Sequence, residues 1–326
     1  MPPARQPHPL RSAVSTYLEL AVVFAVIMAA VVGLEFAFYK PGSAAPALRP
    51  PSAGGGAVPP QFAAPLDPAS AAVAAYASWR VLLTVNDGHF DFFLNWWAHY
   101  LRTGARMGVV VVAESDRVFD DLKALGLPRL TVERSGLSSP ANLAYNTSEY
   151  RAMVSTRPTH ILRHLRQGTN LFYTDIDTVW RGDPTEFIDP SKDLTAATDV
   201  LALDAWSPYY CTGFMAVSAN ARTVALMETW EREMAKEPQL NQPIFNKVLY
   251  ESDATHATFP VALFPNGGVY FDEYGPEARR PVVVVHNNFI VGTDRKRQRF
   301  KDCGLWYEAG AQRPREARQY CTQKRG

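Results

Sequence analysis

Short apolar runs that alternate with amphipathic stretches constrain the fold of this chain most. Residues 81–85 and 107–113 are continuous, β-branched-rich runs, whereas residues 90–102 and 116–125 carry apolar side chains at helical spacing. Parallel strands that are buried on both faces have this continuous apolar character. The alternation therefore predicts an α/β fold: a Rossmann-like, mostly parallel sheet with helices on both faces.

The same reasoning predicts the later elements of the globular body. We expect strands at 130–132, 171–174, 193–198, 210–218 and 282–285, helices at 150–167, 221–234 and 241–249, and a turn at 264–268. The body is expected to span residues 79–308, and residues 309–326 form a basic, polar tail.

The N-terminal part has a different character. Residues 17–39 are apolar except near their ends, and a helix of this length spans about 30–35 Å, enough for a bilayer. The basic, acid-free leader 1–16 favours a cytosolic N-terminus, and the Pro/Ala/Gly-rich residues 40–78 suit a stem. We expect an uncleaved signal anchor and a type II protein of the Golgi or ER–Golgi membrane with a lumenal body. The core 20–34 also suits a cleaved signal peptide.

Composition excludes some functions and leaves others open. A net charge of +1 without a basic stripe argues against nucleic-acid binding. The three cysteines show no CxxC spacing, which argues against a zinc site. Cys303 and Cys321 could pair and leave Cys211 free, or all three could be reduced. Asn146 begins an N-glycosylation sequon, which fits a lumenal body.

Two carboxylates follow an apolar strand in the stretch Leu171–Trp180. If Asp175 and Asp177 continue that strand, they share one face, where a hard cation such as Mg²⁺ or Mn²⁺ would relieve their repulsion. The alternative is a pair of aspartates that only cap a turn. Asn86 also follows a strand, and ligands of such folds gather at the carboxyl ends of strands. These residues are therefore expected to share a site.

His286 follows four valines and is expected at another strand end. A neutral imidazole there could complete a metal shell with the two aspartates, or could simply bond a carbonyl. The cationic residues 295–297 follow shortly after it. They could neutralise a diphosphate, or form an ordinary solvated helix face.

An ordered series of segments resembles the nucleotide-diphospho-sugar transferase family, which includes plant-type arabinosyl-, xylosyl- and galactosyltransferases. The segments run in order through most of residues 79–308: LFYTDIDTVWRGDP, CTGFMAVSAN, NQPIFNKVL, FPNGGVYF and HNNFIVGTDRKRQRFKDCGLW. The resemblance implies a GT-A fold and transfer of a pentose or galactose from a UDP-sugar donor to a glycan or glycoprotein acceptor. It also implies Mn²⁺ (or Mg²⁺) and retention of the anomeric configuration.

The resemblance also assigns roles by position. It implies metal ligation by Asp175, Asp177 and His286, and donor binding by Thr84, Asn86, Asp175 and Lys296. Gly213, Asn241 and Gln242 would lie on the sugar or acceptor side. The family commonly has Asp-Gln where this chain has Asn241-Gln242, so no nucleophile or base is assigned.

Two rival functions use the same residues. An Asp-x-Asp after an apolar strand also resembles the signature of haloacid-dehalogenase-like phosphatases. The Asn241 departure is compatible with a third hypothesis, a catalytically silent, membrane-anchored binding protein on the transferase fold.

Overall fold

The computed structural model describes residues 79–136, 143, 145–199, 208–237 and 239–307. The strands are β1 (Trp79–Val85), β2 (Gly108–Ala113), β3 (Leu130–Arg134), β4 (Asn170–Thr174), β5 (Thr178–Trp180), β6 (Leu194–Thr198), β7 (Tyr210–Val217), β8 (His256–Thr258) and β9 (Val284–His286). The α-helices are α3 (Phe90–Arg102), α4 (Asp116–Ala124), α5 (Ser148–Ser155), α6 (Arg157–Leu165), α7 (Ala221–Met234), α8 (Asn241–Tyr250), α9 (Pro276–Arg279) and α10 (Thr293–Asp302).

The predicted anchor, stem and tails lie outside the described residues. Within the described part of the chain, no helix is long and apolar enough to cross a membrane. The anchor at 17–39 therefore remains a prediction.

A seven-stranded sheet forms the centre of the body in the order β3-β2-β1-β4-β7-β6-β8. The pairings of β1 with β2 and β4, of β2 with β3, and of β6 with β8 are parallel. β7 runs antiparallel to both β4 and β6. A separate two-stranded antiparallel sheet joins β5 to β9. The predicted mostly parallel α/β sheet is confirmed for strands β3 to β4. The antiparallel strand β7 lies between β4 and β6.

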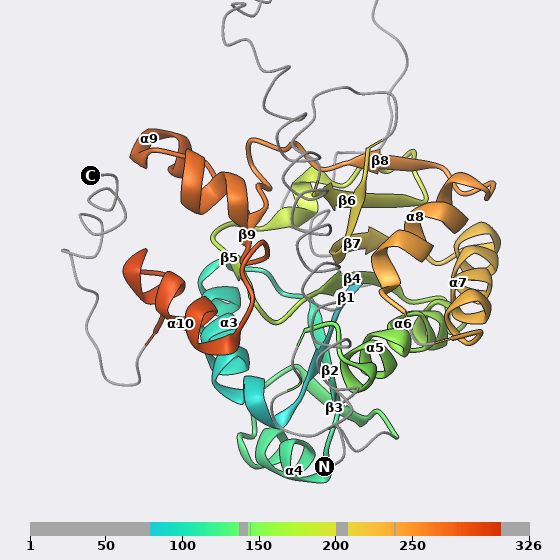
Figure 1. Ribbon diagram of the computed structural model, residues 1–326, viewed down its shortest axis with the longest axis horizontal. Helices are drawn as coiled ribbons and strands as arrows, with labels where there is room; N and C mark the ends of the chain where they lie inside the picture. The colour runs from blue at the N-terminus through green and yellow to red at the C-terminus, as the bar shows by residue number, and fades with distance from the viewer. Residues whose placement is uncertain (1–78, 137–142, 144, 200–207, 238, 308–326) are drawn as a thin grey trace, which may run out of the picture. The chain divides into compact units, whose positions relative to one another are not determined.

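Helices cover both faces of the sheet, as the alternation predicted. On one face, Val81, Leu83 and Phe172 pack with residues of α3 and α4 in one buried core. On the other, Leu82 and Tyr173 pack with α6, α7 and α8 in a second core. Neighbouring strand residues point to opposite faces, so each apolar run feeds both cores. Figure 1 shows α6, α7 and α8 grouped on one side and α3 on the other.

A third, smaller core supports the two-stranded sheet. Val179 of β5 and Val285 of β9 are fully buried with Phe92 and with Phe300 of α10. α3 thus packs on both the main sheet and the β5–β9 pair, and it holds them beside each other (Figure 1).

The predicted helix at 150–167 is wrong as a single element. α5 ends at Ser155 and α6 begins at Arg157, with Pro158 in the first turn of α6. Proline lacks the N–H that a continuous helix would need there, but it is tolerated in a first turn. The break brings the Arg157 side chain to the carboxyl edge of the sheet.

The C-terminal third differs most from expectation. The turn expected at 264–268 leads into a π-helix, η3 (Gly268–Glu273), and the sequence analysis did not predict β8, η3 or α9. The strand expected at 282–285 forms as β9 three residues long, outside the main sheet, and His286 belongs to it. Cys211 is a free, buried thiol, whereas Cys303 is disulfide-bonded.

Candidate functional site

Asp175 and Asp177 lie in a reverse turn between β4 and β5, not on a strand. β4 ends at Thr174, and the Thr178 amide donates to the Asp175 carbonyl at 3.2 Å. The Thr178 hydroxyl donates to the same carbonyl at 3.0 Å. The expectation that strand alternation aligns the two carboxylates is therefore wrong. The turn instead brings both carboxylates to face the same histidine.

That histidine is His286, and β-sheet register places it. β5 pairs with β9 so that Thr178 lies opposite His286. The His286 Nε2 atom is 3.6 Å from Asp175 Oδ2 and 3.3 Å from Asp177 Oδ1. The predicted trio thus forms one cluster, although more than a hundred residues separate the aspartates from the histidine.

Two cations hold the outer oxygens of the carboxylates. Lys296 of α10 donates to Asp177 Oδ2 at 2.5 Å. Arg157 donates to Asp175 Oδ1 at 2.7 Å and also to the Thr212 carbonyl at 2.9 Å. The structure therefore puts the predicted Lys296 in the site and adds Arg157, which the sequence analysis did not single out.

The neighbouring charges set the ionisation of Asp177 and His286, which are both buried. Burial alone would raise the pKa of Asp177, but the Lys296 ammonium and His286 hold it well below its usual range. Burial alone would lower the pKa of His286, but Asp177 and Asp175 raise it above its ordinary value. The Lys296 ammonium and the Arg157 guanidinium thus balance the charge of the two carboxylates.

Gly213 of β7 lies directly beneath this cluster. A Cβ atom there would be 2.4 Å from His286 Cε1 and 2.6 Å from Asp175 Oδ2. Only glycine permits this approach between strand and ligands. The residue predicted for the sugar side therefore lies against the metal candidates themselves.

The two amides predicted for the sugar or acceptor side occupy different places. Gln242 donates to Asp199 Oδ2 at 2.9 Å and accepts from the Thr212 amide at 3.3 Å, so it faces the site. Asn241 is 7% exposed, donates to the Val154 carbonyl at 3.3 Å and accepts from the Thr212 hydroxyl at 3.4 Å. Asn241 therefore links α8 to both α5 and β7, and its donation to the Val154 carbonyl is a structural reason for an amide in place of a carboxylate.

Thr84 and Asn86, predicted for the nucleotide, lie at the carboxyl end of β1. Asn86 is 5% exposed and its Oδ1 atom is 2.7 Å from His89 Nδ1. Thr84 hydrogen-bonds the buried Tyr173 side chain. Beside them Glu114, directly after β2, is 2% exposed, and burial raises its pKa to about 7. Its Oε2 atom has no hydrogen-bond partner among the described residues.

The donor set suits a hard divalent cation. Two carboxylate oxygens and one imidazole nitrogen lie within 4.8 Å of one another. Neighbouring ligands of an octahedral ion bound at 2.0–2.1 Å are about 3 Å apart, close to the distances from His286 Nε2. One oxygen of each carboxylate faces the shared centre while the other bonds a fixed cation, so the residues present fit Mn²⁺ or Mg²⁺.

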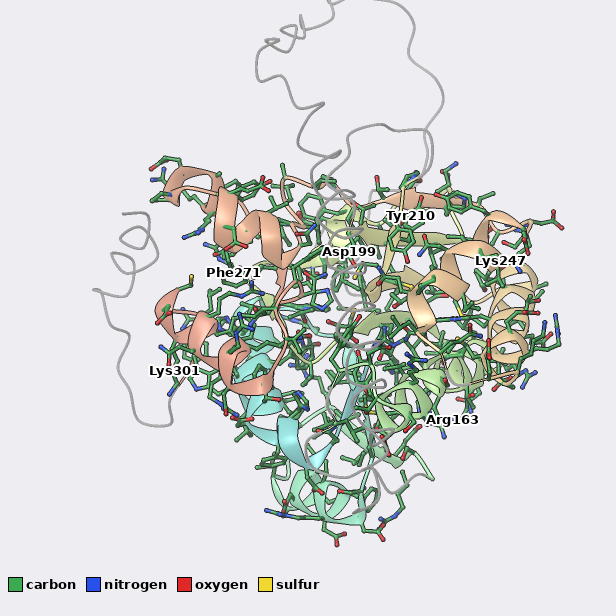
Figure 2. All side chains as sticks on the ribbon, in the orientation of Figure 1. Arg163, Asp199, Tyr210, Lys247, Phe271 and Lys301 are labelled. Atoms are coloured by element: carbon green, nitrogen blue, oxygen red, sulfur yellow. The ribbon has the colours of Figure 1, made fainter. Side chains whose placement is uncertain are left out.

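Some site residues were missed because local patterns mark them weakly or not at all. Arg157, Asp199 and Cys211 reach the site from a helix start and from two strands, so their proximity depends on tertiary structure. Figure 2 shows Asp199 close to the end of β6 and far from Lys247 and Lys301. The strand-to-loop position of Asp199 after 194–198 was the one signal available.

Asn146, the predicted glycosylation site, is exposed just before α5. Its side-chain oxygen accepts a hydrogen bond from Arg151 at 2.8 Å. The position is accessible, and its modification remains a prediction.

With this geometry in place, comparison with known proteins identifies the family. Residues 106–300 match the model of the nucleotide-diphospho-sugar transferase family. Because this match covers more than half of the chain, the protein belongs to that family of glycosyltransferases. The membership sets aside the phosphatase hypothesis.

Individual relatives are more distant. The chain is 26% identical over 251 residues to the UDP-D-xylose:L-fucose alpha-1,3-D-xylosyltransferase 3 of Arabidopsis thaliana, a match that covers 69% of this chain and 66% of the relative. It is 26% identical over 202 residues to the UDP-galactose:fucoside alpha-3-galactosyltransferase of Dictyostelium discoideum, covering 54% of this chain and 31% of the relative.

Solved structures match at lower identity. The galactosyltransferase LgtC, crystallised with donor and acceptor sugar analogs, matches with a TM-score of 0.45 at 13% identity, over 64% of this chain and 87% of that one. The apo form of mouse xyloside xylosyltransferase 1 matches with a TM-score of 0.45 at 10% identity, over 65% of this chain and 98% of that one.

Proposed function

We propose that this protein transfers a sugar, a pentose or galactose, from a UDP-sugar to a hydroxyl of a glycan or glycoprotein. The observation that carries the proposal is the Asp175–Asp177–His286 cluster, in which Asp177 and His286 are buried and Lys296 and Arg157 bond the outer carboxylate oxygens. The cluster lies in a member of the nucleotide-diphospho-sugar transferase family. The Arabidopsis and Dictyostelium relatives are named for UDP-D-xylose and UDP-galactose.

Cleavage of the bond between the sugar and the diphosphate leaves negative charge on UDP. A divalent cation, Mn²⁺ or Mg²⁺, held by Asp175, Asp177 and His286, would supply Lewis-acid stabilisation of that charge. Lys296, 24% exposed at its side chain, is at the rim of the cluster and could exchange Asp177 for a phosphate oxygen. Once it bonds the diphosphate in the bound donor, the ammonium stabilises the charge that develops on the leaving group.

Arg157 has a different role because three hydrogen bonds fix its side chain. It bonds Asp175 and both oxygens of Thr212, and its guanidinium carbon lies 4.7 Å above the Tyr173 ring. These bonds fix the orientation of the Asp175 carboxylate, so Arg157 is a positioning residue.

The sugar would lie beside Gly213, between the cluster and the Gln242–Asp199 pair. Gln242 offers an amide to sugar hydroxyls, and Asp199 orients that amide. The retention implied by the family resemblance is supported by the "alpha" linkages in the names of these relatives, since UDP-xylose and UDP-galactose are themselves α-linked. We assign no nucleophile.

We also propose the cellular setting as type II anchoring through residues 17–39 in the Golgi or ER–Golgi membrane. The hydropathy of that segment and the exposed sequon at Asn146 support it. Digestion of the body by protease added to intact microsomes would argue against a lumenal domain. An unchanged apparent mass after glycosidase treatment of permeabilised microsomes would argue against glycosylation at Asn146.

A UDP-sugar panel tests the proposed activity. The full-length protein in detergent is incubated with UDP-xylose, UDP-galactose, UDP-arabinose or UDP-glucose and Mn²⁺, with and without fucosylated and other glycoside acceptors, and UDP release is measured. We expect metal-dependent release from one donor, stimulated by one acceptor class. Tight binding of UDP, with no UDP released from any of the UDP-sugars, would instead support the catalytically silent binding protein.

A further inference from the structure

His286 has a second nitrogen, and a different set of ligands surrounds it. While Nε2 faces the two aspartates, Nδ1 is 3.4 Å from the Cys211 sulfur. The Cys211 thiol also hydrogen-bonds Asp199. The Asp199 carboxylate, the Cys211 sulfur and a His286 nitrogen all lie within 4.8 Å of one another. One histidine therefore belongs to two clusters, one on each side of its ring.

The second cluster lines a cavity, so an ion would have somewhere to sit. Asp199, Cys211 and His286 line it together with Thr198 and Asn266, and apolar residues such as Phe214 close it. Asn288 and Gln242 hold the two Asp199 oxygens at 2.7 and 2.9 Å, which fixes the carboxylate at the cavity wall. A carboxylate oxygen with one hydrogen bond keeps a lone pair for a metal.

The chemistry of the two clusters differs. Two carboxylates and an imidazole suit a hard cation, whereas thiolate, imidazole and carboxylate suit Zn²⁺. Zinc bonds of 2.3 Å to sulfur and 2.0–2.1 Å to nitrogen place these two ligands about 3.6 Å apart in a tetrahedron. The distance of 3.4 Å between Cys211 Sγ and His286 Nδ1 is close to that value. Three protein ligands would leave the fourth position open toward the cavity.

The two clusters compete for one imidazole. A neutral ring has one lone pair, so it ligates through Nε2 with the proton on Nδ1, or through Nδ1 with the proton on Nε2. In the second tautomer an N–H faces Asp175 and Asp177 in place of a ligand. An ion on the sulfur side therefore removes the third ligand from the oxygen side.

We propose that Asp199, Cys211 and Nδ1 of His286 form a second cation site, specific for thiophilic ions such as Zn²⁺, and that its occupation inhibits the hard-cation site. On binding, the Cys211 S–H bond breaks, the sulfur keeps the electron pair and bonds the metal, and the proton leaves to solvent. No electron transfer is involved. The site itself does not depend on the proposed transfer reaction, whereas its inhibitory effect does.

Cobalt binding tests the site without any sugar nucleotide. Co²⁺ is added to the full-length protein in detergent, and thiolate-to-cobalt absorption is recorded in the near ultraviolet. We expect one thiolate-bound Co²⁺ per chain, displaced by Zn²⁺, and loss of this absorption in Cys211→Ser. Asp177→Asn is the matched control: it alters the other side of His286 and should keep the band. Absence of the band in the folded wild type, or its survival in Cys211→Ser, would overturn the site.

Zinc inhibition tests the coupling. The Zn²⁺ concentration that halves transfer at fixed Mn²⁺ is compared between wild type and Cys211→Ser, each normalised to its own zinc-free activity. Loss of a residue that hydrogen-bonds a metal ligand weakens metal binding by up to ~100-fold. Loss of a ligand itself should therefore raise this Zn²⁺ concentration by at least ~100-fold. Cys211→Ala serves as a second variant if serine perturbs folding, judged by circular dichroism. Equal inhibition of wild type and variant would refute the coupling, while the cobalt result still decides the site.

Discussion

The two halves of the body build their contribution to the site in different ways. From β1 to β4 the strands are five to seven residues long, pair in parallel and alternate with helices. From Asp175 onward, β5, β8 and β9 have three residues each, and the small sheet is antiparallel. The first half provides a regular sheet edge, and the second provides most of the candidate metal ligands from short strands and loop ends.

This difference predicts which substitutions will change stability and which will change activity. Regular, buried strands tolerate little change in burial or charge, so the first half should respond mainly in stability. Ligands that only converge through tertiary contacts should respond mainly in chemistry, because the backbone around them can survive their loss. The following substitutions probe this division, beginning with the largest expected effect.

Asp177→Asn should lower transfer by ~10²–10³-fold or more, since it removes a ligand charge and the partner of Lys296. Thermal stability should change far less. UDP release and a melting curve are measured on the same preparation. Asp120→Asn, on the exposed face of α4, is the matched control and should leave both unchanged. A variant with full Mn²⁺-dependent activity would remove Asp177 from the metal site.

Glu114→Gln should act on stability in the first half. Burial raises the folded pKa of Glu114 from 4.5 to about 7, so the folded state holds a proton that the unfolded state has lost between these pH values. Native stability should therefore fall as pH rises through this window. At pH 8 the variant should be more stable than wild type by about 3 kcal/mol, and at pH 4 the two should agree. Urea midpoints at both pH values provide the measurement, and an equal gain at both would contradict the assignment.

Gly213→Ala, on β7 where the second half pairs with β4, should change the geometry of the candidate metal ligands without disrupting the fold. The new Cβ would displace His286 and Asp175, which are side chains and can yield, so we expect an increase of about 10–100-fold in the Mn²⁺ concentration needed for activity. Gly275→Ala, where a Cβ meets nothing within 4 Å, is the control. Unchanged Mn²⁺ dependence would mean that the ligands do not need this close approach.

Asn241→Asp restores the carboxylate common in the family, and it should cost stability without improving transfer. The buried amide donates to the Val154 carbonyl, and a carboxylate there would face that oxygen with no proton to donate. We expect a loss of about 1–3 kcal/mol in unfolding free energy. The same amide-to-acid change at the exposed Gln167 is the control. Increased transfer in Asn241→Asp would instead make the position catalytic.

The sequence predicts the first half well and the second half partly, for a physical reason. Apolar periodicity reports burial over five residues or more, so β1, α3, β2 and α4 were recognisable. A three-residue strand such as β8 or a π-helix such as η3 has too few positions to show a period. The break at Pro158 was visible in principle, but the helical spacing on either side of it concealed the interruption.

The site shows the same limit. The clustering of Asp175, Asp177, His286 and Lys296 could be predicted, because acids after an apolar strand and the ordered family segments mark these residues. The reason first given for the Asp pair, alternation along a strand, was wrong, since a turn joins them. Arg157 and Cys211 carry no local signal and Asp199 only its position after a strand, because only the packed sheet brings the three together.

The pairing of Thr178 with His286 has a thermodynamic consequence. A site assembled from residues so far apart in the chain exists only in the folded state, so an ion that occupies it binds the native protein and not the unfolded chain. Such an ion stabilises the fold by RT ln(1 + [ion]/Kd), about 2.7 kcal/mol at a hundredfold excess over Kd. If a metal ion occupies the site that the β5–β9 register assembles, the melting temperature should rise with its concentration, in the absence of any sugar.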